Sequence, residues 1–130
     1  MTSKPFHYIS SDGFDMYVGK NNFQNDELTF KFANGNDWWF HAKKMPGSHV
    51  IVRTGGKELP DRTFEEAASL AAYYSKGRDQ DKVEIDYVIN ITELKEKQEI
   101  ALGILLYLDE VCRKHHLIYF AADGTLLGLI

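Results

Sequence analysis

Two apolar, aromatic-rich runs on either side of a Pro-Gly turn constrain the fold of this chain most strongly. Residues 38–42 read Trp-Trp-Phe-His-Ala and residues 49–54 read His-Val-Ile-Val-Arg-Thr, with Met45-Pro46-Gly47 between them. Aromatic and β-branched residues favour strands, whereas Pro and Gly favour turns. The sequence therefore predicts two adjacent strands that form part of a larger sheet.

Further strand and helix signals surround this pair. Alternating apolar and polar residues on both sides of an Asp-Gly turn predict strands over 6–9 and 14–18, and residues 83–88 predict another. A short helix, ended by Asn-Gly, is predicted within residues 22–33, although Thr29, Phe30 and Phe32 also suit a strand. These elements indicate an α+β protein.

A second helix is predicted to begin at a capping box. In Thr63-Phe64-Glu65-Glu66, Thr63 has the residue type of an N-cap, and Glu66 occupies the third helical position. Alanines and apolar residues continue the helical pattern until it stops near Gly77. We expect this helix to pack closely against the sheet.

The longest helical pattern covers residues 93–116, and a strand over 117–121 and a turn at Asp123-Gly124 follow it. The predicted fold is therefore an antiparallel or mixed sheet with flanking helices, and a long C-terminal helix followed by a short strand. The chain ends on an apolar segment, residues 125–130, which must be buried to stay soluble. This end could join two copies in a homo-oligomer.

Composition narrows the class of protein. The chain has 130 residues, 44% hydrophobic and 26% charged, which suits one compact domain with its own core. It contains no apolar run of the roughly 18 residues that a membrane span needs, and its first residues lack the apolar centre of a signal peptide. The single cysteine, Cys112, cannot form an internal disulfide. We expect a cytoplasmic protein without a membrane partner.

Charge is distributed unevenly along the chain. The net charge is −4, which argues against a purely electrostatic nucleic-acid binder. Residues 1–57 nevertheless carry a net charge of +2, and residues 58–130 carry −6. Any site for a polyanion should therefore lie in the first half.

Residues 37–53 combine groups that bind single-stranded nucleic acid, because aromatic rings stack on bases and cations contact phosphate. Trp38 and Trp39 are adjacent on a predicted strand, so their side chains point to opposite faces. One of them must point away from the core, and an exposed tryptophan often marks a binding face. A plain hairpin explains the run equally well.

The histidines in this run do not predict catalysis or a metal site. His41 and His49 have no third ligand at a suitable spacing, so no metal is expected. Ser48 and His49 are neighbours on a strand and face opposite ways, so they do not predict a nucleophile–base pair. No cofactor motif is present either.

Two other polar clusters could bind phosphate. Lys20-Asn21-Asn22 precedes the first predicted helix, where backbone N–H groups can hold an anion, although a turn and N-cap explain the asparagines more simply. Lys76 and Arg78 follow the second predicted helix. They complement its dipole, and they could also extend a basic rim.

Several blocks, in order, give the chain a strong resemblance to NFACT-R, the RNA-binding domain of the NFACT family. The family includes bacterial ribosome-quality-control factors, some of which are labelled fibronectin-binding proteins. The resemblance covers residues 13–87 and rests on these blocks: Tyr17-Val18-Gly19-Lys20-Asn21-Asn22, Gln24-Asn25-Asp26, Asn36 to Lys43, Pro46 to Arg53, Glu65 to Ala68, Ala71 to Lys76, and Val83 to Tyr87.

The resemblance implies a non-enzymatic α+β domain that binds RNA and, in full-length members, helps to hold tRNA on an obstructed large ribosomal subunit. We assign residues 1–90 to this domain. The resemblance implies RNA contacts at Lys20, Asn21, Asn22, His41, Lys43, Ser48, His49 and Arg53. The residue types add Trp38, Trp39, Lys44 and Lys76 as candidates.

The last third of the chain resembles a second family. Residues 105–120, followed by Gly124-Thr125-Leu126-Leu127-Gly128, are similar to the start of LicD-type nucleotidyltransferases. We assign residues 91–130 to a helical fragment of this kind, which could dock on the first part. The resemblance implies nucleotide binding at Asp123, Gly124 and Thr125 as an alternative function. A protein–protein interaction module is a third possibility.

Overall fold

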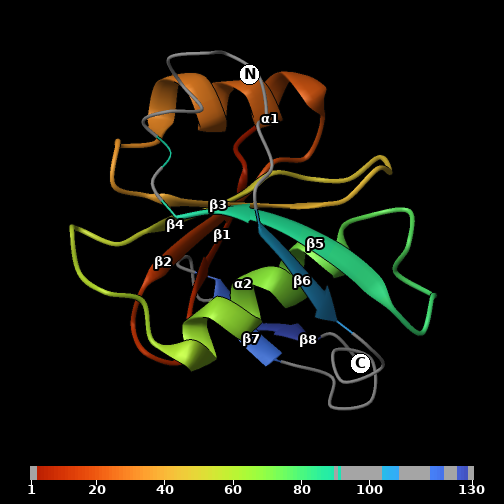
Figure 1. The fold of residues 1–130 in the computed structure, drawn as a ribbon. Coiled ribbons are helices and arrows are strands. Elements are labelled where there is room, and N and C mark those ends of the chain that lie inside the picture. The colour runs from red at the N-terminus through yellow and green to blue at the C-terminus, as the bar shows by residue number, and fades with distance from the viewer. Residues whose placement is uncertain (1–2, 90, 92–103, 109–117, 122–125, 129–130) are drawn as a thin grey trace.

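The computed structural model describes residues 3–89, 91, 104–108, 118–121 and 126–128, and it shows an α+β fold (Figure 1). One antiparallel sheet has the strand order β6-β5-β3-β4-β2-β1-β7-β8. The strands are β1 (Phe6–Ile9), β2 (Asp15–Val18), β3 (Trp38–Ala42), β4 (Val50–Arg53), β5 (Val83–Val88), β6 (Ile104–Leu108), β7 (Ile118–Ala121) and β8 (Leu126–Gly128). The strand predictions for the first 90 residues are confirmed.

The two predicted strand pairs form as antiparallel pairs. β1 and β2 align Phe6 with Val18 and Ile9 with Asp15, on either side of a turn in which Gly13 has a φ of 89°. β3 and β4 pair from Trp38 opposite Val52 to Phe40 opposite Val50. β2 pairs with β4 and β5 pairs with β3, so the two hairpins form the centre of one sheet.

The two helices lie on opposite faces of the sheet (Figure 1). Helix α1 (Asn22–Glu27) continues directly into a π-helical turn, η1 (Leu28–Phe32), in which the Ala33 N–H donates to the Leu28 carbonyl at 2.9 Å. Helix α2 (Asp61–Tyr73) covers the other face. The short first helix and the presence of a helix that packs on the sheet therefore agree with the sequence patterns.

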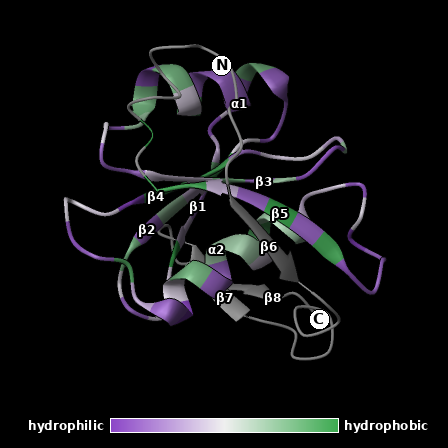
Figure 2. Cartoon of the chain, viewed as in Figure 1, coloured by the Kyte–Doolittle hydropathy of each residue, from purple (hydrophilic) through white to green (hydrophobic). Residues whose placement is uncertain are grey.

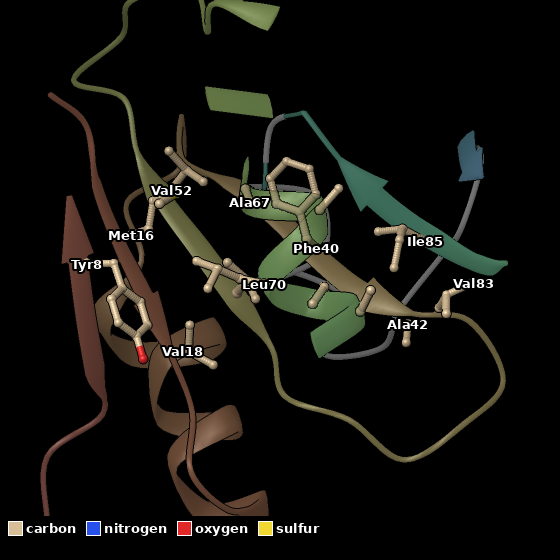
Figure 3. Close-up of a cluster of buried hydrophobic side chains, with 14 of the residues drawn as sticks. Tyr8, Met16, Val18, Phe40, Ala42, Val52, Ala67, Leu70, Val83 and Ile85 are labelled. Atoms are coloured by element: carbon tan, nitrogen blue, oxygen red, sulfur yellow. The ribbon is translucent and has the colours of Figure 1, made fainter. Parts of the chain in front are cut away.

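The α2 face holds the main hydrophobic core. Side chains from β1 to β5 converge on α2, and Phe40, Leu70 and Ile85 have no accessible surface (Figure 3). Ala67 and Ala71 bring the helix close to the sheet, as the alanine-rich pattern predicts. β5 alternates hydrophobic and hydrophilic residues, and Ile85 points toward this core (Figures 2 and 3).

The opposite face holds a smaller core under α1 and η1. Trp39, Ile51, Leu28, Ala33 and Ile91 form it, and each is at most 2% exposed. Both faces of the central strands are therefore covered, which the sequence pattern of a single hairpin does not reveal.

The predicted capping box at Thr63 and Glu66 is wrong. Helix α2 begins at Asp61 after Pro60, and no side chain caps it. Thr63 Oγ1 instead contacts Ser10 Oγ at 2.7 Å and donates to Asp12 Oδ2 at 2.8 Å. The Glu66 carboxylate accepts from the backbone N–H and the hydroxyl of Ser11. Both side chains therefore connect α2 to the β1–β2 turn. Their hydrogen bonds to this turn replace the hydrogen bonds to the helix N-terminus that a capping box would make.

The predicted helix over residues 93–116 is wrong at residues 104–108, which form β6; the rest of that range lies outside the described residues. β6 pairs with β5 from Val83 opposite Leu108 to Tyr87 opposite Ile104. A continuous apolar run satisfies strand and helix patterns alike, and the free edge of β5 supplies backbone partners that favour the strand. The predicted strand over 117–121 is confirmed as β7, which pairs with β1 and β8.

Candidate nucleic-acid interface

Three segments that are far apart in the sequence meet at an open groove of about 440 Å³. They are residues 20–25 at the start of α1, residues 46–48 in the β3–β4 loop, and residues 73–78 at the end of α2. We call this feature the basic groove. It unites Lys20-Asn21-Asn22, Pro46-Gly47-Ser48 and Lys76, which the sequence analysis had selected separately.

Backbone pairing joins the β3–β4 loop to the end of α2. Gly47 and Ser75 form an antiparallel bridge, with the Ser48 N–H donating to the Tyr74 carbonyl and the Lys76 N–H donating to the Pro46 carbonyl, both at 3.0 Å. A Cβ atom on Gly47 would lie 3.0 Å from the Ser75 Cβ, so the close approach favours glycine. This contact fixes the position of Lys76 relative to the loop.

Asn25 joins α1 to the same loop. Its Oδ1 accepts from the His49 N–H at 3.0 Å, and its Nδ2 donates to the Gly47 carbonyl at 3.4 Å. Ser48 Oγ donates to the Gly19 carbonyl at 2.5 Å. A Cβ on Gly19 would lie 2.1 Å from Asn25 Oδ1, so glycine is required here. Asn25 is a site residue that the sequence reasoning missed, and its buried amide gave no local signal.

The asparagines before α1 have the structural role that their residue type predicts. Asn21 is the N-cap, and its Oδ1 accepts from the Gln24 N–H at 2.8 Å. Gln24 Oε1 accepts in turn from the Lys20 N–H at 2.9 Å. These two backbone donors are therefore already satisfied by the chain itself.

Three exposed cations border the basic groove. Lys20 Nζ lies 4.8 Å from the centre of the Phe6 ring, and the Arg78 guanidinium lies 4.2 Å from that of Tyr73. Lys76 is the third. Among the described residues that line the groove there is no Asp or Glu. Coulomb attraction therefore favours a polyanion here, although the chain as a whole is acidic.

The two histidines of the run are partly buried and contact other side chains of the protein. His49 Nδ1 is 2.6 Å from Thr29 Oγ1, and its ring centre is 5.3 Å from that of His41. Burial and then the neighbouring His41 lower the pKa of His49 to about 4, and burial lowers the pKa of His41. Both are neutral at pH 7, so neither supplies a charge for phosphate.

The two tryptophans differ in exposure. They point to opposite faces, as predicted, but Trp39 has no accessible surface because α1 and η1 cover it. Trp39 therefore cannot stack on a base in this structure. Trp38 is half-buried on the α2 face and packs edge-on against Phe64, with ring centres 5.7 Å apart.

Arg53 lies at the opposite end of β4 from His49 and supports the fold. Its Nη2 donates to the Phe32 carbonyl at 2.7 Å, and its Nε is 3.3 Å from Oδ2 of the buried Asp37. Its guanidinium also stacks on the Phe32 ring at 4.1 Å. These contacts anchor the end of η1 to the sheet and place Arg53 outside the basic groove.

The remaining predicted residues lie outside the groove lining. Lys43 Nζ is 3.9 Å from a Glu84 carboxylate oxygen, and Lys44 is exposed with a φ of 54°. Asp123, Gly124 and Thr125 lie outside the described residues. In the described part of the chain, no three metal-ligating side chains cluster, and no helix has the length and apolar character to cross a membrane.

Residues 4–106 match the NFACT protein RNA binding domain. The chain belongs to this family. The match begins earlier and ends later than the motifs alone indicate, and it reaches into β6. The family therefore covers the basic groove, strands β1 to β5 and the first part of β6.

Named relatives agree with the family match. The chain is 49% identical over 86 residues to the Rqc2 homolog RqcH of Streptococcus suis. These residues make up 65% of this chain and 15% of that protein. It is 31% identical over 85 residues to the ribosome quality control complex subunit NEMF homolog of Drosophila melanogaster. These residues make up 65% of this chain and 9% of that protein. The chain thus spans a small part of these relatives.

A solved structure shares the fold. The C-terminal part of the fibronectin/fibrinogen-binding protein from Streptococcus suis superimposes with a TM-score of 0.70 at 36% identity. The superposition covers 84% of this chain and 46% of that one.

Proposed function

We propose that this NFACT RNA-binding domain binds RNA through the basic groove, and that it acts as a non-catalytic module in ribosome quality control. The convergence of three separate segments on one groove is the observation that carries the proposal. The residues that line the groove include Lys20, Lys76 and Arg78. No described Asp or Glu lines it, although the chain carries a net charge of −4. Such local concentration of positive charge favours phosphate.

The choice of RNA rests on the family, and the choice of process rests on the relatives' names. A tRNA on the large ribosomal subunit is the RNA that we propose. The groove is open and has exposed polar side chains at its rim, which suits contact with a folded phosphate backbone. Recognition would therefore depend on backbone shape and charge.

A binding role also fits the chemistry of the polar groups. The Ser48 hydroxyl donates to the Gly19 carbonyl, whereas the His49 ring contacts Thr29, so this pair does not form a nucleophile and base. The pKa of His49, about 4, leaves it a poor base for a hydroxyl. We propose that no reaction takes place in the groove.

The test is binding of fluorescently labelled tRNA to the purified chain over a series of salt concentrations. We expect Lys76→Gln, Lys20→Gln and Arg78→Gln to weaken binding, and each to reduce the slope of log affinity against log salt by about 0.7–0.9 if it removes one phosphate contact. Lys57→Gln is the matched control, because Lys57 is exposed and does not line the groove.

Two results would contradict the proposal. One is the absence of salt-dependent binding by the unmodified chain. The other is a loss of affinity in Lys57→Gln that equals the loss in the groove variants. If tRNA and an RNA duplex that lacks the tertiary shape of tRNA bind equally well, the proposal of RNA binding stands and the proposed preference for tRNA is wrong.

A further inference from the structure

A second cavity, of about 530 Å³, lies beside the basic groove on the α1 side of the sheet. One wall is the N-terminal segment, residues 3–5, and the other is formed by α1 and η1. Gln24 Nε2 donates to the Ser3 carbonyl at 2.9 Å and holds the two walls together. We call this cavity the aromatic pocket.

Flat rings form much of its lining. His7 and Tyr17 stack with ring centres 4.2 Å apart, and Tyr17 meets Phe32 edge-on at 4.7 Å. His7 is fixed by Asp15, with Nε2 2.8 Å from Oδ1. Rings held in this way lose little entropy when another planar group packs on them.

Phe23 is exposed at the mouth of this pocket. It lies in the first turn of α1, and 67% of its surface is accessible, the largest fraction among the exposed large hydrophobic residues of the described chain. An aromatic side chain left in water at a cavity mouth indicates a ligand that covers it.

Charge and position identify the ligand class. Asn21 lines both the aromatic pocket and the basic groove, so the two sites are adjacent. Lys4 and Lys31 add positive charge to the lining; Glu27 is the opposing charge, and its carboxylate is 3.1 Å from Lys31 Nζ. A planar group attached to a polyanion fits this combination better than an aliphatic peptide does.

We propose that the aromatic pocket binds an unstacked nucleobase of the same RNA whose phosphates occupy the basic groove, with Phe23 stacking on the base. This inference rests on the proposed function and adds a base-binding subsite to it. Recognition of single-stranded RNA commonly combines an electropositive track with aromatic platforms, and stacking tolerates any base.

The test uses a single-stranded RNA oligomer that carries one 2-aminopurine, whose fluorescence falls when the base stacks. We expect binding to quench the fluorescence, and we expect Phe23→Leu to abolish the quenching and weaken binding about five- to hundredfold. Leucine keeps an apolar side chain and removes only the ring. The salt dependence should stay the same, because no charge is lost.

Ile9→Ala is the matched control, because Ile9 is 40% exposed on β1 and lines neither site. Unchanged quenching and affinity in Phe23→Leu, with weaker binding in Lys76→Gln, would overturn the base subsite and leave the proposed function intact. Binding of tRNA without binding of the oligomer would overturn the base subsite alone, and binding of neither RNA by the unmodified chain would overturn both. A concentration-dependent dimer that Phe23→Leu abolishes would assign the pocket to a second copy instead.

Discussion

The two faces of the sheet differ in what covers them. On the α2 face, a thirteen-residue helix packs on side chains from five strands and forms a large apolar core. On the α1 face, a six-residue helix and one π-helical turn cover a small core surrounded by polar groups. His49, Thr29, Asn25 and Asp37 are all at least partly buried there.

We interpret this difference as a division between stability and the proposed recognition of RNA. The α2 core packs side chains from five strands together, whereas the polar network on the α1 face positions the β3–β4 loop and the start of α1. The basic groove forms where this network meets the end of α2, and the aromatic pocket lies on the outer side of α1. Three predictions test the division, beginning with the largest effect.

A matched pair of leucines compares the two cores. Leu70 on α2 and Leu28 on η1 are both at most 2% exposed. We expect Leu70→Ala to lower the free energy of unfolding by about 3–5 kcal/mol and Leu28→Ala by about 2–3 kcal/mol, since the short α1–η1 segment can shift into the cavity. Urea denaturation measures both. A larger loss in Leu28→Ala would contradict the ranking of the two cores.

The second prediction concerns pH and the partly buried His49. The folded protein keeps His49 neutral down to about pH 4, whereas an unfolded histidine binds a proton near pH 6.5. The unfolded state therefore binds more protons between these values, and stability should fall as pH decreases through this window, by up to roughly 3 kcal/mol. The measurement is urea denaturation between pH 7.5 and 4.

His49→Gln is the comparison for this experiment, because glutamine does not titrate and can still contact Thr29. The difference in stability between the two proteins should shrink or reverse as pH falls. Since burial also lowers the pKa of His41, some pH dependence of the same sign should remain. An identical pH dependence in both proteins would show that His49 is not the titrating group.

The third prediction is that Arg53 stabilises the folded protein and does not contact RNA. Arg53→Ala leaves the buried Asp37 carboxylate without the guanidinium and removes a contact to η1. Because Arg53 is itself partly exposed, we expect a loss of about 2 kcal/mol rather than the larger cost of breaking a fully buried pair. The salt dependence of RNA binding should be unchanged. A reduced slope without a loss of stability would return Arg53 to the RNA interface, as the family resemblance implied.

Local sequence patterns predicted most of the central fold. The strands at 38–42, 49–54 and 83–88 appear within one residue of their predicted ends, because alternation and β-branched residues act over a few neighbours. The predictions of a capping box at Thr63–Glu66 and of a helix at 104–108 were wrong for the same reason. In each case a partner distant in the sequence, the β1–β2 turn or the edge of β5, offered hydrogen bonds that outweighed the local preference.

The candidate site was predicted only in part. The family resemblance selected Lys20 and Ser48, and residue type selected Lys76; all three line the basic groove. The resemblance also selected His49 and Arg53, and residue type selected Trp39, but the structure uses these three as internal contacts. Two adjacent tryptophans show that the side chains face opposite ways, but they do not show that a helix covers each face.

The sequence by itself determined the α+β class, the central strands and the presence of three polar clusters, since these depend on periodicity and residue type within short windows. Only the tertiary structure decided that the clusters form one groove. That outcome depends on the Gly47–Ser75 bridge, on the hydrogen bond from Asn25 to Gly47 and on that from Ser48 to Gly19, which join segments more than twenty residues apart. Contacts of this range are set by packing of the whole sheet, and no local pattern encodes them.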